Sequence, residues 1–149
     1  MGLLENISDS IIKAIKIKNN DELESLRAIK SALLLARTQK NSGGKISQAD
    51  EIKILQKLVK QRKESAEIYS NQDRLELAEL ELSQAKVIEK FLPKQLDHYE
   101  IEKIISEIIY QSGAIGMKDM GKVMGIASSR LSGKADGKTI SNIVRSKLS

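Results

Sequence analysis

Residues 91–113 read FLPKQLDHYEIEKIISEIIYQSG, and this stretch divides the chain into two helical parts. Pro93 disfavours helical geometry at the residue before it, so the preceding helix is expected to end there. Asp97 and Glu100 have the spacing of a capping box, which predicts that a new helix begins directly after Asp97. The isoleucines that follow recur at steps of three and four, which favours a helix over a strand. Gly113 is expected to end this helix.

Four helices are expected before this proline. Apolar residues recur at helical spacing in residues 3–18, 21–39, 47–69 and 75–92. Asn20 is expected to cap the second helix and Ser47 the third, because such side chains accept hydrogen bonds from the free N–H groups of a first turn. Residues 42–44, Ser-Gly-Gly, predict a flexible loop between them. The last two segments together, residues 47–92, predict an antiparallel hairpin with coiled-coil-like packing.

Three helices are expected in the remainder of the chain. The middle one opens at Lys118 or Asp119, with Gly133 as its C-cap, and the last one follows Asp136 as N-cap. No stretch has the strict alternation of an exposed strand. The sequence therefore predicts an all-α protein with an N-terminal helical domain of about four helices, residues 1–92, and a small C-terminal three-helix bundle, residues 97–149.

Composition excludes several classes of chemistry. The 149 residues include no cysteine and one histidine, so disulfides, zinc fingers and cysteine nucleophiles are excluded. No acid and base are paired in a recognisable pattern, so no catalytic residue, metal ligand or cofactor is predicted. Two stretches approach the phosphate-binding P-loop, but residues 116–123 end in Val where Mg²⁺ needs Ser or Thr, and residues 133–139 are one residue short between their glycines. Neither follows a strand, so nucleotide hydrolysis is rejected.

The positive charge of the chain lies at one end. Residues 118–149 contain seven Lys or Arg and two Asp or Glu, which accounts for the whole net charge of +5. Such asymmetry favours an acidic partner such as nucleic acid, although a solvated helix face would have the same composition.

The glycines of this basic region allow two interpretations. Gly121 and Gly125 are expected inside one helix, where they indicate either close packing of another helix or close approach of a ligand's backbone. Both near-P-loop stretches also place Gly and Lys at a helix start, where anions are favoured. Asp119 and Asp136, as the expected N-caps, would instead repel a phosphate there.

Several motifs together resemble one protein family. The specific ones are Phe91–Leu96 (FLPKQL), Gly121–Gly125 (GKVMG) and Gly133–Gly137 (GKADG), followed by Ile140 and Val144. Looser matches are Leu3-Leu4, Arg27-x-x-Lys30 and Lys60–Lys63. These residues resemble the GatB/YqeY domain, and the whole chain resembles the stand-alone YqeY-like proteins.

The resemblance implies a function. The same C-terminal domain forms the tail of the B subunit of the glutamine-dependent amidotransferase that converts Glu-tRNA or Asp-tRNA to the amidated form, and this tail contacts the tRNA body. It implies an all-helical fold and a tRNA-binding accessory protein without catalysis of its own. At the matching positions it places three lysines on tRNA or another structured RNA: Lys122, Lys134 and Lys138. The basic region adds Lys118 and Arg130 to these candidate RNA-binding residues. Close backbone approach is assigned to four glycines: Gly121, Gly125, Gly133 and Gly137.

Two other functions stay open at this point. One is a protein-interaction adaptor with no RNA role, in which the hairpin of residues 47–92 docks a partner. The other is an enzyme or enzyme subunit in amide transfer, because the family is linked to carbon–nitrogen ligase activity with glutamine as amido-N-donor. No apolar run is long enough to cross a membrane, and the first residues lack the basic start of a secretory signal, so a cytoplasmic location is expected.

Overall fold

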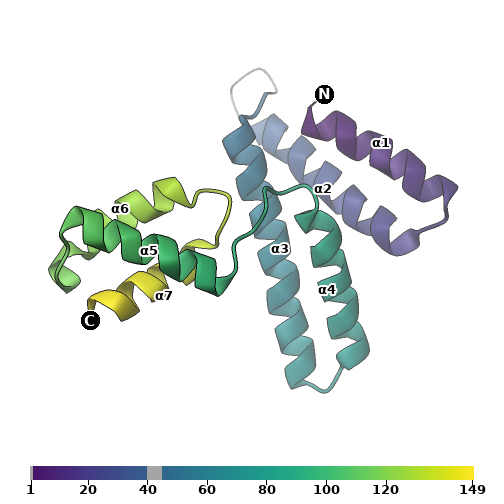
Figure 1. The fold of residues 1–149 in the computed structure, drawn as a ribbon. Helices are drawn as coiled ribbons and strands as arrows, with labels where there is room; N and C mark the ends of the chain where they lie inside the picture. Colours follow the sequence, from purple (N-terminus) through teal and green to yellow (C-terminus); the bar gives the residue numbers. More distant parts are fainter. Residues whose placement is uncertain (1, 40–44) are drawn as a thin grey trace. The chain divides into compact units, whose positions relative to one another are not determined.

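The computed structural model describes residues 2–39 and 45–149, and every regular element in them is helical. The α-helices are Leu3–Lys16 (α1), Asn20–Gln39 (α2), Gln48–Asn71 (α3), Leu75–Glu89 (α4), His98–Ser112 (α5), Met120–Arg130 (α6) and Gly137–Leu148 (α7), with a 3₁₀ turn, η1, at Met117–Asp119 (Figure 1). The all-α prediction is confirmed. The loop expected at residues 42–44 lies outside the described residues.

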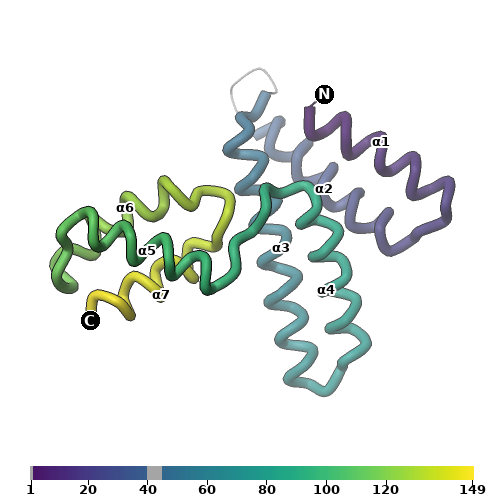
Figure 2. Tube along the Cα trace, in the orientation of Figure 1, coloured from purple at the N-terminus to yellow at the C-terminus, as the bar shows by residue number. Residues whose placement is uncertain are grey.

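The chain divides into two compact units, Met1–Leu92 and Pro93–Ser149, and each has its own apolar core. In the first unit α1 lies against α2, and α3 and α4 run antiparallel as a long hairpin against which α2 also lies (Figure 2). Large side chains that are almost fully buried form this core: Ile7, Leu26, Ile29, Leu33, Leu55 and Ile88. Burial of each such side chain stabilises the fold by roughly 1.5–3 kcal/mol.

Local capping explains where α2 and α3 begin. Ser47 accepts a hydrogen bond from the N–H of Asp50 at 3.1 Å, as predicted for α3. The cap of α2 is Asn19 and not Asn20, because the Asn19 side chain accepts from the N–H of Glu22 at 3.2 Å. The carboxylate of Glu22 in turn accepts from the Asn19 amide at 2.9 Å. Two adjacent asparagines offer the same chemistry, and the turn at Lys18, whose φ is +57°, decides which of them precedes the helix.

The second unit is a three-helix bundle. Its core combines isoleucines of α5 and α7 with small and branched residues of α6: Ile101, Ile105, Ile108, Val123, Ala127, Leu131, Ile140, Ile143 and Val144. Asp97 accepts from the N–H of Glu100 at 2.8 Å, so the predicted cap of α5 is confirmed. Gly113 ends α5 in the left-handed conformation at φ +71°, also as predicted.

Asp119 and Asp136 are the N-cap residues of α6 and α7, as predicted, but the side-chain bonds expected of them and the predicted C-cap Gly133 are wrong. The side chains of Asp119 and Asp136 make no capping hydrogen bond to α6 or α7. Asp119 instead accepts from the N–H of Ile115 at 3.0 Å, because the chain folds into the 3₁₀ turn before α6 begins. The C-cap of α6 is Leu131, and Gly133, at φ +76°, lies two residues further on. Gly133 therefore shapes the loop between α6 and α7 and does not end the helix.

Among the described residues, no helix is long and apolar enough to cross a membrane.

Candidate nucleic-acid interface

The five predicted cationic residues all lie on the surface of the second unit. Lys118 belongs to the 3₁₀ turn, Lys122 and Arg130 to α6, Lys134 to the α6–α7 loop and Lys138 to the first turn of α7, and all are exposed. The same helix, α6, supplies the buried Val123 and Ala127 to the core of the bundle. The core of the bundle thus fixes the backbone from which these cations extend into solvent.

The charges of these side chains are not compensated locally. Within residues 2–39 and 45–149, none of the five forms an ion pair with a carboxylate. Lys122 differs from the others because its Nζ donates to the carbonyl of Ser112 at 3.2 Å, at the C-terminal end of α5. A cation there also complements the negative end of the helix dipole. Lys122 therefore has a structural role, whereas Lys118, Arg130, Lys134 and Lys138 have no described polar contact of their side chains.

The solvent-facing side of α6 is built from small residues. Gly121 and Gly125 are exposed, and a Cβ added to either would meet no atom within 4 Å. The interpretation that they allow close packing of another helix is therefore wrong for the helices of this unit. Ser128 and Ser129 continue the same side at helical spacing and are also exposed. A molecule on this side of α6 can come nearer to the helix backbone than side chains of ordinary size would allow.

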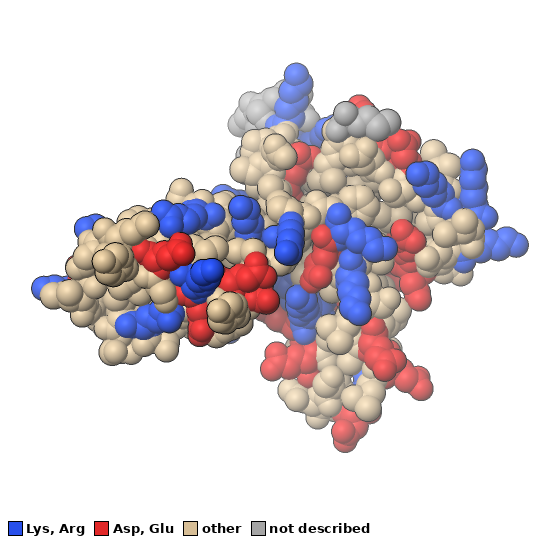
Figure 3. Space-filling view, in the orientation of Figure 1, with Lys and Arg blue, Asp and Glu red and all other residues tan. Residues whose placement is uncertain are grey.

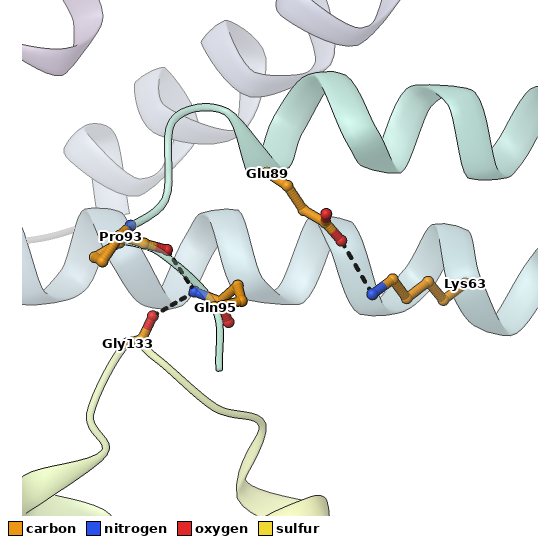
Figure 4. Close-up of polar contacts among 5 residues, drawn as sticks. All are labelled: Lys63, Glu89, Pro93, Gln95 and Gly133. Atoms are coloured by element: carbon orange, nitrogen blue, oxygen red, sulfur yellow. Dashed lines mark hydrogen bonds and ion pairs between the residues drawn. The ribbon is translucent and has the colours of Figure 1, made fainter. Parts of the chain in front are cut away.

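Gly133 differs from the other predicted glycines because it is buried. Its carbonyl accepts from the Nε2 of Gln95 at 2.7 Å, and the same nitrogen donates to the Pro93 carbonyl at 2.9 Å (Figure 4). The N–H of Leu96 donates to the carbonyl of Lys134 at 2.9 Å. The bonds of Gln95 to Gly133 and of Leu96 to Lys134 join the segment before α5 to the α6–α7 loop and so fix the position of the Lys134 backbone.

The geometry shows what sequence reasoning missed at this site. Gln95 has no predicted role of its own within the FLPKQL motif, yet its side chain holds the loop that bears Lys134. Gly137, at the start of α7, is exposed and has open space around it, and no side chain caps the N–H groups that follow. Because Asp136 makes no such bond, the first turn of α7 leaves its N–H groups to solvent beside Lys138.

Other kinds of site are not formed by the described residues. No group of three or more His, Asp or Glu side chains among them lies close enough to hold a metal ion. The Nδ1 of His98 lies 3.5 Å from a carboxylate oxygen of Glu102, and both side chains are largely exposed. An exposed pair of this kind lacks the positioned third group that nucleophilic catalysis requires.

Comparisons with known proteins identify both a family and individual relatives. The family model described as Yqey-like protein matches residues 4–148. Altered inheritance of mitochondria protein 41, mitochondrial, from Clavispora lusitaniae is 33% identical over 106 residues, covering 69% of this chain and 61% of that protein.

Two further relatives are larger proteins that match over a shorter stretch. The E subunit of glutamyl-tRNA(Gln) amidotransferase from Thermococcus gammatolerans is 42% identical over 72 residues, which cover 46% of this chain and 12% of that protein. Its counterpart from Thermococcus sibiricus is 44% identical over 57 residues, or 36% of this chain and 9% of that protein. The chain thus spans less than two thirds of the length of each of these three relatives.

Proposed function

The chain belongs to the YqeY-like protein family, and we propose that it is a tRNA-binding accessory protein without catalysis of its own. The observation that supports this function most directly is the group of exposed, unpaired cations on the second unit. Phosphate oxygens are the natural partners of such cations, and their neutralisation supplies most of the affinity of a protein for nucleic acid. The similarity to part of an enzyme named for Glu-tRNA(Gln) makes tRNA the favoured nucleic acid.

The proposed mode of binding relies on phosphates and shape. Tyr99 and Tyr110 are the exposed aromatic residues of the second unit, and they lie at opposite ends of α5. Recognition of single strands needs a row of aromatic rings on which successive bases stack, and two separated rings do not form one. A folded RNA presents phosphates and 2′-hydroxyls at fixed positions, which suits lysines held on a rigid bundle. The bare backbone at Gly121 and Gly125 would let such an RNA approach α6 closely.

The accessory role is the second part of the proposal. The sequence pairs no acid and base in a recognisable pattern, and the similarity to the amidotransferase from Thermococcus gammatolerans covers 12% of the matched protein. We therefore assign the chain to recognition of the RNA and any amide transfer to a partner enzyme. Purified protein that amidated charged tRNA in the presence of ATP and glutamine would overturn this part.

The location of the protein also stays a proposal. A cytoplasmic site of action is consistent with the sequence. The name of the Clavispora relative adds the mitochondrion as the alternative, to be separated by fractionation of cells that contain the tagged chain.

The test is binding of unfractionated tRNA to the full chain across a salt series. Replacement of Lys118, Lys134 and Lys138 by Gln should weaken binding and lower the magnitude of the log–log salt slope by roughly 0.7–0.9 for each phosphate that is no longer neutralised. These three are chosen because, unlike Lys122, they have no described side-chain contact that the fold needs.

The matched control removes the same charge from the other unit. Lys13, Lys16 and Lys18 are equally exposed and lie at the end of α1 or just after it, so their replacement by Gln should leave tRNA affinity nearly unchanged. Equal losses of affinity in the two triple variants would mean that tRNA binding depends only on the net charge of the protein. That result would contradict a site on the second unit. Absence of salt-sensitive binding by the parent chain would refute the RNA function as a whole.

A further inference from the structure

The α3–α4 hairpin continues beyond the helices that cover it. Along α4 and the turn that ends it, one row of residues recurs at steps of three and four: Leu77, Leu80, Gln84, Val87 and Phe91. Val87 and Phe91 pack against the core of the first unit, and Gln84 is 8% exposed. Leu77 and Leu80, at the other end of the same row, are 38% and 37% exposed. The row is therefore covered near the core and bare towards the turn that joins the two helices.

The facing helix repeats this pattern. On α3 the corresponding row is Ile54, Leu58, Gln61, Ser65 and Ile68. Ile54 and Leu58 pack against the same core, whereas Ile68 is 56% exposed. Because both rows start from one core, Ile68, Leu77 and Leu80 lie on the same side of the hairpin, and we call these three residues the tip face.

The tip face is not needed to hold the hairpin together. Between residues 60 and 84, the buried side chains are Ala66, Ala78 and Gln84. Ala66 and Ala78 belong to the seam between α3 and α4, so small residues make the helix contact there and the large apolar ones point elsewhere. The ion pair of Lys63 with Glu89, at 3.0 Å, joins the two helices independently of the tip face (Figure 4). Exposure of three large apolar side chains on one side therefore has no explanation within the first unit itself.

Negative charge surrounds this apolar side. Residues 64–82 contain six acidic residues and one basic residue, Arg74. Glu64, Glu76 and Glu81 are each four positions from a member of the tip face, which makes them its neighbours on the helix surface. Within the described residues none of the six acids is in an ion pair. Figure 3 shows acidic side chains gathered around the free end of the hairpin.

We propose that the tip face docks an amphipathic helix of another protein, whose apolar stripe is flanked by lysines and arginines. The three apolar residues supply a surface for the stripe, and Glu64, Glu76 and Glu81 supply charges complementary to its flanks. A second copy of this chain that presented its own tip would place glutamates against glutamates, so the charge pattern selects a basic partner. This interaction uses none of the residues assigned to RNA and is independent of that function.

The test uses synthetic helical peptides as probes of the full chain. One fluorescent peptide of about three heptads has leucines at the two apolar positions of each heptad and lysines at the flanking positions. The second peptide has glutamates in place of the lysines. Anisotropy should show salt-sensitive binding of the lysine peptide and no binding of the glutamate peptide.

Variants of the chain identify the surface. Replacement of Ile68, Leu77 and Leu80 by Gln should weaken binding at least about tenfold, because central apolar contacts supply most of the affinity of such interfaces. In the matched control, Gln replaces Ile12 and Ile15, which are each 52% exposed on α1. This variant should bind the peptide as the parent does.

A third variant tests the charges around the tip face. Replacement of Glu64, Glu76 and Glu81 by Gln should weaken binding and remove its dependence on salt. All the side chains replaced in these variants are exposed or half-exposed, and circular dichroism would verify that helix content is kept.

Three outcomes would overturn the proposal. The first is unchanged binding of the lysine peptide by the apolar triple variant, and the second is equal binding of the two peptides. The third is a dimer of the parent chain, seen by sedimentation, that the apolar triple variant dissociates, because a second copy would then occupy the tip face.

Discussion

At the scale of single residues, Gln95 connects two parts of the second unit that lie far apart in sequence. Its Nε2 bonds the Gly133 carbonyl at 2.7 Å across 38 positions, and Gly133 is buried. We predict that Gln95→Ala lowers the free energy of unfolding by about 1–3 kcal/mol, because a buried carbonyl loses its partner. Urea denaturation followed by circular dichroism measures this change.

A matched variant isolates the hydrogen bond from the loss of a glutamine as such. Gln111 lies exposed on α5 without a described hydrogen bond of its side chain, so Gln111→Ala should change the free energy of unfolding by no more than about 0.5 kcal/mol. If the two variants lose the same stability, the bond to Gly133 contributes nothing beyond helix and surface effects.

The caps show which single-residue features a sequence can specify. Asp97 and Gly113 are predicted correctly because their partners are within three or four positions, so the local pattern contains the whole interaction. Asp119 is placed correctly before α6, but its expected capping bond is absent because the N–H of Ile115, in the turn that precedes the helix, donates to the same carboxylate. The bond between Gln95 and Gly133 has no local signature, because it forms only when the bundle has closed.

At the scale of one element, α6 combines weak helix formers with an exposed surface. Gly125 lies inside the helix with open space at its Cβ position. We predict that Gly125→Ala raises the free energy of unfolding by about 0.5–1 kcal/mol, since alanine loses less backbone entropy and meets no obstacle. The same change should weaken tRNA binding, because the added methyl group keeps an approaching RNA away from the helix backbone.

Two measurements on one variant therefore test the role of the glycines. Thermal denaturation reports stability, and a tRNA titration reports affinity. Ser128→Ala is the control, since it also favours the helix but adds no bulk on the same exposed side. A Gly125→Ala protein that is more stable and binds tRNA as tightly as the parent would show that close approach to α6 plays no part.

For the α3–α4 hairpin, the sequence predicts the two helices but not which of their apolar residues are covered. Periodicity alone predicts two antiparallel helices, and the structure has them. The same periodicity cannot say where along Ile54–Ile68 or Leu77–Phe91 a third helix stops covering the row, because covered and bare positions have the same spacing. The exposure of Ile68 and of its neighbours on α4 is a property of tertiary packing.

At the scale of the whole molecule, two cores without shared members predict separate responses to damage. Ile108 is 1% exposed in the second core, so Ile108→Asp places an unpaired charge among apolar side chains. We predict that this variant unfolds Pro93–Ser149 and leaves the first unit folded. Two-dimensional NMR spectra should lose the dispersed signals of the second unit alone.

The reciprocal variant completes this test. Leu55 is equally buried in the first core, and Leu55→Asp should unfold the first unit while the second keeps its signals. Loss of all dispersed signals in either variant would mean that the units depend on each other for stability.

The candidate site is predictable in one respect at this scale. Counting charged residues along the sequence locates the excess of positive charge in residues 118–149, because such a count needs no structure. The count cannot show that Lys122 also contacts the end of α5, or that the other cations lack acidic neighbours in ion-pair contact. Pairing depends on which helices meet, and that is decided by the core of the bundle.

The separate cores also have a consequence for the order in which the protein forms during its synthesis. The described residues of the first core and its surroundings lie between Leu3 and Leu92, and those of the second between Leu96 and Leu148. Translation at roughly 5–20 residues per second leaves on the order of several seconds between the emergence of the first stretch and that of the second. The first unit can therefore complete its core on the ribosome, before the second unit has fully emerged.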